Sequence, residues 1–311
     1  MDVILHLGAH RTGSTSFQRF MQANARALAN QSIGFWGPGR TRKGLLHGVA
    51  DRPETPDQTR RAVGRVQLNM KGAARNGAAV LIVSDENMIG TARRCLRARL
   101  LYPEVGERMA RLNGAFSPIR RVVLQIRSLE SWWASSMAYL IPRGGGIPPA
   151  AALEQLSLGP RSWRHVITDL ACACPDAEIL VSPFERYGPR PDRLFAEMTG
   201  SLFPPKARPD EFWVNQRPRL PQLRAVLEER GEDPDMLPRG DGRWHPFSDL
   251  QAARLREAYA DDLFWLRAGA DGLARLTEDP EPAKPAIQLV AGLDKRGQND
   301  DGSARRLAPT R

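Results

Sequence analysis

Short apolar segments alternate with long helical patterns along the chain, and this alternation restricts the fold more than any other feature. Runs of apolar residues predict β-strands at residues 3–7, 78–84, 121–126 and 178–182. Helical spacing predicts helices at residues 15–30, 57–75, 129–140 and 248–268. Strands separated by long helices form parallel sheets, which need helices on both faces. We therefore expect an α/β fold, a parallel β-sheet flanked by helices on both faces, with ligands bound beyond the carboxyl ends of the strands.

The length of 311 residues and a hydrophobic content of 41% allow one large domain with a substantial core. We expect this domain to span residues 1–276. Residues 277–311 are first rich in proline and then charged, so we expect a C-terminal tail of uncertain order.

The formal net charge of +10 favours an anionic partner, such as a nucleotide, a sulfated or phosphorylated acceptor, a membrane surface or nucleic acid. The three cysteines, Cys95, Cys172 and Cys174, support neither a disulfide framework nor a zinc site. The first residues lack the basic lead and the long apolar run of a signal peptide, and no run reaches the length of a membrane span. A cytoplasmic protein without a membrane span is therefore expected.

The segment GAHRTGST, residues 8–15, lies between the first predicted strand and the helix that follows it. At such a junction free backbone N–H groups and the helix dipole attract an anion. Nucleotide kinases and ATPases have G-x-x-x-x-G-K-[ST] here, but Ser14 stands where that lysine belongs, and the nearest cation is Arg11. The pattern predicts a fold of the P-loop nucleotide-binding type, with the cation of the loop moved forward.

This displaced pattern resembles the 5′-phosphosulfate loop of the sulfotransferases that use 3′-phosphoadenosine 5′-phosphosulfate (PAPS). Bacterial members of that family often begin with a segment similar to GAHKTGTTS, and this chain has GAHRTGSTS. The resemblance implies that Arg11 neutralises the bridging oxygen as the S–O bond breaks, although arginine differs from the usual lysine in reach and geometry. It also implies that the 5′-phosphate is held by the backbone of Thr12, Gly13, Ser14, Thr15 and Ser16 and by the hydroxyls of Ser14 and Thr15.

A second segment, RRVVLQIR followed by SLESWWASS, resembles the 3′-phosphate loop of the same family. That loop has an arginine at a strand end and a serine eight residues later on the next helix, and Arg127 and Ser135 have this spacing. An arginine fork and a hydroxyl group can converge on one phosphate. Ser128 and Leu129 replace the acidic residue and proline that often follow the arginine. The resemblance further implies that Phe184 lies near the adenine.

Sulfuryl transfer needs a group that accepts the proton of the acceptor and cations that stabilise the departing phosphate. It needs no redox cofactor and, in principle, no metal. Three residues are candidates for the base: Glu86 just past a strand, His47 in a basic loop, and His10 in the phosphate loop. Glu86 ranks first because its strand should carry it to the ligand edge of the sheet. Equally, its carboxylate could cap the next helix or pair with Arg93 or Arg94.

The sequence thus predicts a sulfotransferase that moves a sulfuryl group from PAPS to a hydroxyl or similar acceptor. The acceptor could be a carbohydrate, a lipid, a small alcohol or phenol, or a peptide tyrosine, selected by the loops at residues 34–56 and 142–149. A P-loop phosphotransferase acting on a nucleotide is the alternative enzyme, against which the missing GK[ST] counts. A basic nucleic-acid-binding protein would explain the charge, but the sequence has no recognised module of that kind, so no nucleic acid is expected as partner.

Overall fold

The computed structural model describes residues 1–201, 204–207, 211–212, 214 and 216–277. The predicted tail therefore lies outside the described residues, except for Thr277. Of the helices that the structure describes, none has the length and apolar character needed to cross a membrane.

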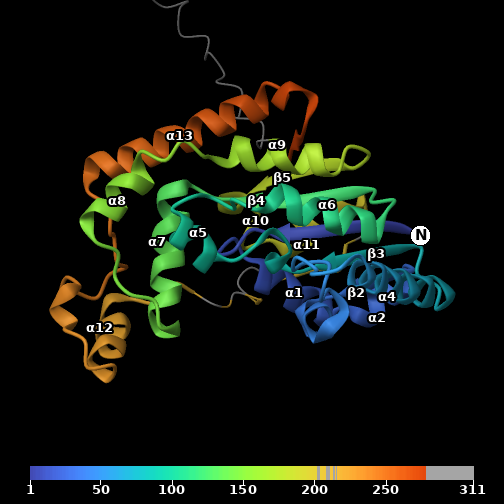
Figure 1. Cartoon of the computed structure of the whole chain (residues 1–311), viewed down its shortest axis with the longest axis horizontal. Helices are drawn as coiled ribbons and strands as arrows, with labels where there is room; N and C mark the ends of the chain where they lie inside the picture. The colour runs from blue at the N-terminus through green and yellow to red at the C-terminus, as the bar shows by residue number, and fades with distance from the viewer. Residues whose placement is uncertain (202–203, 208–210, 213, 215, 278–311) are drawn as a thin grey trace, which may run out of the picture. The chain divides into compact units, whose positions relative to one another are not determined.

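A single six-stranded sheet forms the centre of the described domain (Figure 1). Its order is β2-β3-β1-β4-β5-β6, and every neighbouring pair is parallel. The strands are β1 (Asp2–Gly8), β2 (Ile33–Trp36), β3 (Val80–Ser84), β4 (Arg121–Ile126), β5 (Glu178–Pro183) and β6 (Arg275–Leu276). The four predicted strands are β1, β3, β4 and β5. The two edge strands, β2 and β6, were not predicted.

Helices cover both faces of the sheet, as predicted. Successive side chains of each strand point to opposite faces, so each face has a hydrophobic core of its own. Ile4 of β1 packs with one cluster, whereas Val3 and Leu5 pack with a larger one. The smaller cluster is covered by α1 (Ser14–Ala23), α2 (Ala25–Asn30), α10 (Phe184–Tyr187) and α11 (Pro191–Thr199). The larger one includes side chains of α4 (Pro56–Arg75), α5 (Ala92–Ala98), α6 (Val105–Phe116), α7 (Leu129–Leu140), α8 (Ala150–Ser157), α9 (Trp163–Ala173), α12 (Leu220–Glu229) and α13 (Asp249–Arg267).

Local signals in the sequence start two of the long helices. Pro56 opens α4, and the Thr55 hydroxyl accepts a hydrogen bond from the Gln58 N–H, which satisfies one free amide of the first turn. The Ser248 and Gln251 side chains cap α13 reciprocally. Short helical turns complete the chain: α3 (Pro38–Arg40), η1 (Thr41–Leu45), η2 (Glu86–Ile89), η3 (Ile141–Arg143), η4 (Pro234–Met236) and η5 (Ala270–Gly272). Part of the loop expected from residue 34 onward is therefore a strand followed by helical turns.

The strand order creates a switch point between β1 and β4. The chain leaves β1 toward β2 on one side of the sheet, and it leaves β4 toward β5 on the other. The two connections diverge, and in open α/β sheets ligands bind in the crevice beyond the strand ends at such a point. Both predicted phosphate loops begin there, since one follows β1 and the other follows β4.

Residues 220–242, which precede α13 in the chain and which we call the α12 excursion, begin and end side by side. Arg219 and Arg243 form an isolated antiparallel bridge, and the Leu220 N–H donates to the Gly242 carbonyl at 2.9 Å. The segment between them contains α12 and η4 and lies beside the carboxyl end of α7 (Figure 1). Arg230 fixes it there by donating to the carbonyl of Ile141 at 3.0 Å.

Candidate functional site

The loop after β1, residues 9–13, is a tight turn fixed by hydrogen bonds. The Ala9 N–H donates to the Gln125 carbonyl of β4 at 3.0 Å, and the Thr12 hydroxyl donates to the Ala9 carbonyl at 2.7 Å. Arg11 and Gly13 have φ angles of 62° and 86°. A left-handed arginine is uncommon, and strained backbone of this kind clusters at functional sites. No side chain among the described residues caps the start of α1, and the first N–H groups of such a helix attract anions.

The two predicted phosphate loops contact each other directly. The Arg11 Nε donates to the Ser135 hydroxyl of α7 at 3.0 Å, and the Arg127 Nη1 donates to the Arg11 carbonyl at 3.0 Å. The Arg127 guanidinium also lies 4.5 Å from the ring centre of Phe184. The structure therefore brings together four residues that the sequence analysis took from three separate segments.

A cavity of about 110 Å³ lies between these loops. Its described lining holds four arginines and no carboxylate. The residues are Arg11, Gly13, Ser14, Thr15, Ser16, Arg127, Ser135, Phe184, Val214, Gln216, Arg217 and Arg243. Of the predicted nucleotide-binding residues only Thr12 is absent from this lining, because its side chain is fully buried beneath the loop.

The arginines make this cavity, which we call the anion cavity, strongly electropositive. Burial and then the nearby charges of Arg127 and Arg143 lower the pKa of Arg11 to about 10. Burial, with Arg127, Arg243 and Arg11 as neighbours, lowers the pKa of Arg217 to about 10 as well. The Nε and Nη2 atoms of Arg217 are buried and have no hydrogen-bond partner among the described residues. Buried donors of this kind are costly unless a ligand satisfies them, so the cavity is suited to an anion with several acceptor oxygens.

Glu86, the first candidate base, lies next to the loop after β1, at the start of η2. A Cβ atom on Gly8 would lie 3.2 Å from the Cβ atom of Glu86, so the loop passes close to it. Its oxygens accept hydrogen bonds from Gln18 Nε2 at 3.0 Å and from Arg42 Nη2 at 2.8 Å. Burial alone would raise the pKa of this carboxyl, but attraction by cationic His10 and Arg42 outweighs burial and lowers the pKa to about 2. Arg42 is the cation that persists at neutral pH, and a carboxylate held this way is a weak base.

His10, in the loop after β1, is held by hydrogen bonds to two neighbours, Tyr102 and Asn87. Its backbone N–H donates to the Tyr102 hydroxyl at 2.9 Å, so that hydroxyl is free to donate to His10 Nδ1, also at 2.9 Å. The Nε2–H then donates to Asn87 Oδ1 at 3.0 Å. Burial lowers the pKa of His10, which keeps the ring neutral in this tautomer. Both ring nitrogens are engaged within the protein.

His47, the other candidate base, lies on the surface and does not line the anion cavity. Its side chain is 82% exposed, and Nδ1 is 4.0 Å from an Asp51 carboxylate oxygen. The structure thus separates His47 from the phosphate loops. The sequence analysis also proposed Arg93 or Arg94 as a partner for Glu86, but the carboxylate pairs with Arg42 instead.

A buried polar network that the sequence analysis did not predict joins β1 to the strands on either side of it. His6 of β1 contacts the Ser84 hydroxyl at 2.7 Å and Gln125 Oε1 at 3.1 Å. The Gln125 oxygen can only accept, so His6 Nε2 carries the proton and Nδ1 accepts from Ser84. Gln18 of α1 donates to Ser84 and links the network to the Glu86 carboxylate. Burial lowers the pKa of His6 to about 4, so this histidine joins three strands as a neutral hydrogen-bonding group.

Arg217 and Arg243 are the other residues that the sequence analysis missed. They stand near the two ends of the α12 excursion, and no motif or periodicity marks them.

Searches against protein-family models, curated proteins and solved structures gave no match to this chain.

Proposed function

We propose that this chain is a sulfotransferase, which transfers a sulfuryl group from PAPS to a hydroxyl or similar acceptor. The observation that supports this most strongly is the anion cavity itself. Two loops that each resemble a phosphate loop of that family contribute to one lining, together with four arginines. A nucleotide with phosphates at both its 3′ and 5′ ends matches two phosphate loops better than a nucleotide with one phosphate chain does.

The lining fits the anionic parts of such a donor. The amides of residues 12–16 and the hydroxyls of Ser14 and Thr15 would hold the 5′-phosphate, and Arg127 and Ser135 would hold the 3′-phosphate. The buried, unpaired donor atoms of Arg217 would gain acceptors. The volume of about 110 Å³ suits phosphate groups and not a whole nucleotide, since complete ligand pockets usually measure about 300–1,000 Å³. The remainder of the donor would therefore lie outside the cavity.

We assign Arg11 the role of stabilising the charge that develops on the departing phosphate. PAPS supplies a sulfuryl group activated by its bond to a phosphate. As that bond breaks, negative charge grows on the phosphate oxygen, and Arg11 would stabilise this charge more than it stabilises the ground state. Its hydrogen bond to Ser135 keeps the guanidinium between the two loops, where both phosphates would be within its reach.

The acceptor would bind in a neighbouring cavity of about 420 Å³. This cavity shares Gln216 and Arg217 with the anion cavity, and its lining includes Pro142 from the loop expected to select the acceptor. Of the three predicted bases, His47 does not line the anion cavity and both ring nitrogens of His10 are hydrogen-bonded within the protein, which leaves Glu86 as the candidate for taking the acceptor's proton. Glu86 is ionised at neutral pH and lies beside the P-loop, but its low pKa and its pairing with Arg42 favour a positioning role.

The proposal is tested by comparing 3′-phosphoadenosine 5′-phosphate (PAP), the desulfated donor, with ATP and magnesium. Thermal unfolding is followed in a buffer free of phosphate and sulfate, because these ions would compete for the anion cavity. A ligand at 100 times its Kd stabilises a protein by about 2.7 kcal/mol. We expect a concentration-dependent rise in Tm with PAP and a smaller one with ATP.

Sulfuryl transfer is then measured by mass spectrometry, with PAPS and panels of carbohydrates, lipids, phenols and tyrosine peptides. A mass increase of one sulfuryl group on an acceptor, with matching release of PAP, supports the proposal. Equal or greater stabilisation by ATP with magnesium would instead favour a nucleotide-dependent phosphotransferase. Failure of PAP to bind at millimolar concentration would remove the basis of the proposal.

A further inference from the structure

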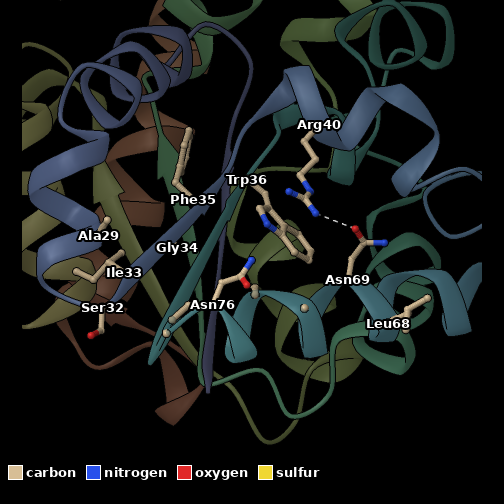
Figure 2. Close-up of a pocket in the computed structure, with 14 residues that line it drawn as sticks. Ala29, Ser32, Ile33, Gly34, Phe35, Trp36, Arg40, Leu68, Asn69 and Asn76 are labelled. Atoms are coloured by element: carbon tan, nitrogen blue, oxygen red, sulfur yellow. Dashed lines mark hydrogen bonds between the residues drawn. The ribbon is translucent and has the colours of Figure 1, made fainter.

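A groove remote from the predicted phosphate loops follows the free edge of the sheet at β2. It has a volume of about 470 Å³ and lies between this strand and the carboxyl half of α4 (Figure 2). All four residues of β2 line it, although neighbouring side chains of a strand point to opposite faces. The groove therefore runs along the backbone edge of the strand and not over one face. We call it the β2 groove.

The backbone of β2 presents unpaired hydrogen-bonding groups to this groove. The Val80 N–H of β3 donates to the Ser32 carbonyl at 3.2 Å, and Ile33 is the partner of Val80 in the parallel register. In a parallel ladder, alternate residues bond to the same neighbouring strand. Gly34 and Trp36 therefore pair with β3, whereas Ile33 and Phe35 direct their N–H and C=O groups to the open edge. No described residue is bonded to these edge groups.

The wall opposite β2 consists mainly of small or polar residues of α4. Gly72 and Ala73 add little side-chain bulk to this lining. Asn69 and Asn76, labelled in Figure 2, contribute amide groups. An exposed edge strand is a template for another extended chain. The four residues of β2 extend over roughly 13 Å, which suits an added segment of about four residues.

Positive charge lies at the carboxyl end of the β2 groove. Arg40 stacks on the Trp36 ring at 4.6 Å and donates to Asn69 Oδ1 at 2.7 Å, as Figure 2 shows. Arg40 and Asn69 also line an adjacent cavity of about 540 Å³. That cavity adds Lys43 and Arg65, and no carboxylate appears among the described residues of either lining. The groove thus combines an uncharged, strand-like track with a cationic end.

We propose that the β2 groove binds the carboxyl-terminal end of a partner polypeptide. The partner adds to the sheet as an extended strand parallel to β2 and bonds to the edge groups of Ile33 and Phe35. In this direction its last residue lies at the carboxyl end of β2, where the free carboxylate meets Arg40 and Lys43. The edge N–H and C=O groups favour a polypeptide over an acyl chain, which could not pair with them. This inference does not depend on the proposed sulfuryl transfer.

Synthetic peptides with random sequences and free carboxyl ends represent the partner in the test. Peptides selected from this library on the immobilised full-length protein are measured by calorimetry as free acids and as carboxyl-terminal amides. We expect amidation to weaken binding at least tenfold, because it removes the charge that meets the cationic end. Saturating PAP should leave binding unchanged. Displacement by PAP would place the peptides in the anion cavity and would overturn the proposal.

Two matched pairs of variants locate the binding site. Phe35→Pro removes the edge N–H without affecting the ladder to β3, and Phe35→Ala loses the same ring but keeps the N–H. The proline variant should bind at least tenfold more weakly than the alanine variant. Arg40→Glu should weaken binding similarly, whereas Lys71→Glu should not, because residue 71 lies on the same side of the sheet in α4 but outside the groove lining. Equal binding within either pair would overturn the proposal.

Hydrogen exchange on the parent protein covers the case in which Phe35→Pro does not fold. Bound peptide should slow the exchange of the Ile33 and Phe35 amides, while the amides of Gly34 and Trp36 are already paired with β3. Unchanged exchange at Ile33 and Phe35 in a saturated complex would exclude strand addition. Analytical ultracentrifugation tests a second copy of the chain as the occupant instead. A dimer that Phe35→Pro dissociates and Phe35→Ala does not would refute the proposed partner.

Discussion

Replacing Arg217 with methionine is expected to stabilise the ligand-free protein and to weaken its binding of PAP. Two nitrogens of Arg217 are buried without partners among the described residues, and burial with the nearby Arg127 and Arg243 lowers its pKa from 12.5 to about 10. That difference corresponds to about 3 kcal/mol against the charged form. Solvent around the rest of the side chain reduces the expected gain in unfolding free energy to about 1–2 kcal/mol. A lost charge-assisted hydrogen bond of about 1.5–3 kcal/mol should weaken PAP binding roughly 10- to 150-fold.

Urea unfolding without ligand measures the first effect, and calorimetry with PAP measures the second. The matched control is Arg219→Met, since Arg219 is exposed on the same segment and should change stability by no more than about 0.5 kcal/mol. The two effects of Arg217→Met have opposite signs, so a general loss of structure cannot imitate them. Unchanged PAP binding, or a ligand-free protein destabilised by about 1 kcal/mol or more, would refute the assignment of Arg217 to an anion site.

Arg127→Ala should weaken PAP binding by about 1.5–3 kcal/mol and Ser135→Ala by less, as measured by calorimetry; parental affinity in Arg127→Ala would disprove the 3′-phosphate assignment. Glu86→Gln should lower turnover about 10²–10⁴-fold at saturating acceptor if Glu86 is the base, and much less if it only positions Arg42. The folded pKa of Glu86 is about 2, against 4.5, so its stabilising effect is present above pH 4.5 and lost toward pH 2. The urea midpoint of Glu86→Gln, measured against pH, should not show the additional fall between pH 4.5 and pH 2. The folded pKa of His6 is about 4, against 6.5, so the protein should lose up to about 3 kcal/mol of stability as pH falls from 6.5 to 4. His6→Gln should flatten that slope, and parallel pH curves for parent and variant would argue against a neutral buried His6.

The central strands were predictable because burial on both faces makes each a continuous apolar run. β2 was missed because it has four residues, includes Gly34 and precedes a Gly-Pro-Gly segment, all of which indicate a loop. β6 has two residues and depends on its neighbour β5. Edge strands of this length carry little local signal, and the tertiary pairing decides them.

The position of the two predicted phosphate loops at one edge of the sheet was predictable because each loop has a local motif and follows a strand. Their direct contact through Arg11, Ser135 and Arg127 was not predicted. Arg217 and Arg243 have neither a local motif nor a strand end, since the folding of the α12 excursion alone brings them to the anion cavity. The pairing of Glu86 with Arg42 could not be predicted from the sequence either. Sequence spacing suggested Arg93 and Arg94, whereas the chain around η1 returns a more distant arginine to the end of β3.

The bridge between Arg219 and Arg243 has a consequence for how such a protein can diversify. Residues 220–242 leave and rejoin the domain at one point, so their length and sequence can change without altering any strand, provided that core positions such as Leu223 and Leu227 stay apolar. Arg217 precedes that point and Arg243 forms part of it, so both cations stay in place when the intervening helix is exchanged. A recombination experiment could therefore exchange residues 220–242 as one segment. The neighbouring cavity of about 420 Å³ would change shape, while Arg217 and Arg243 would keep their positions in the anion cavity.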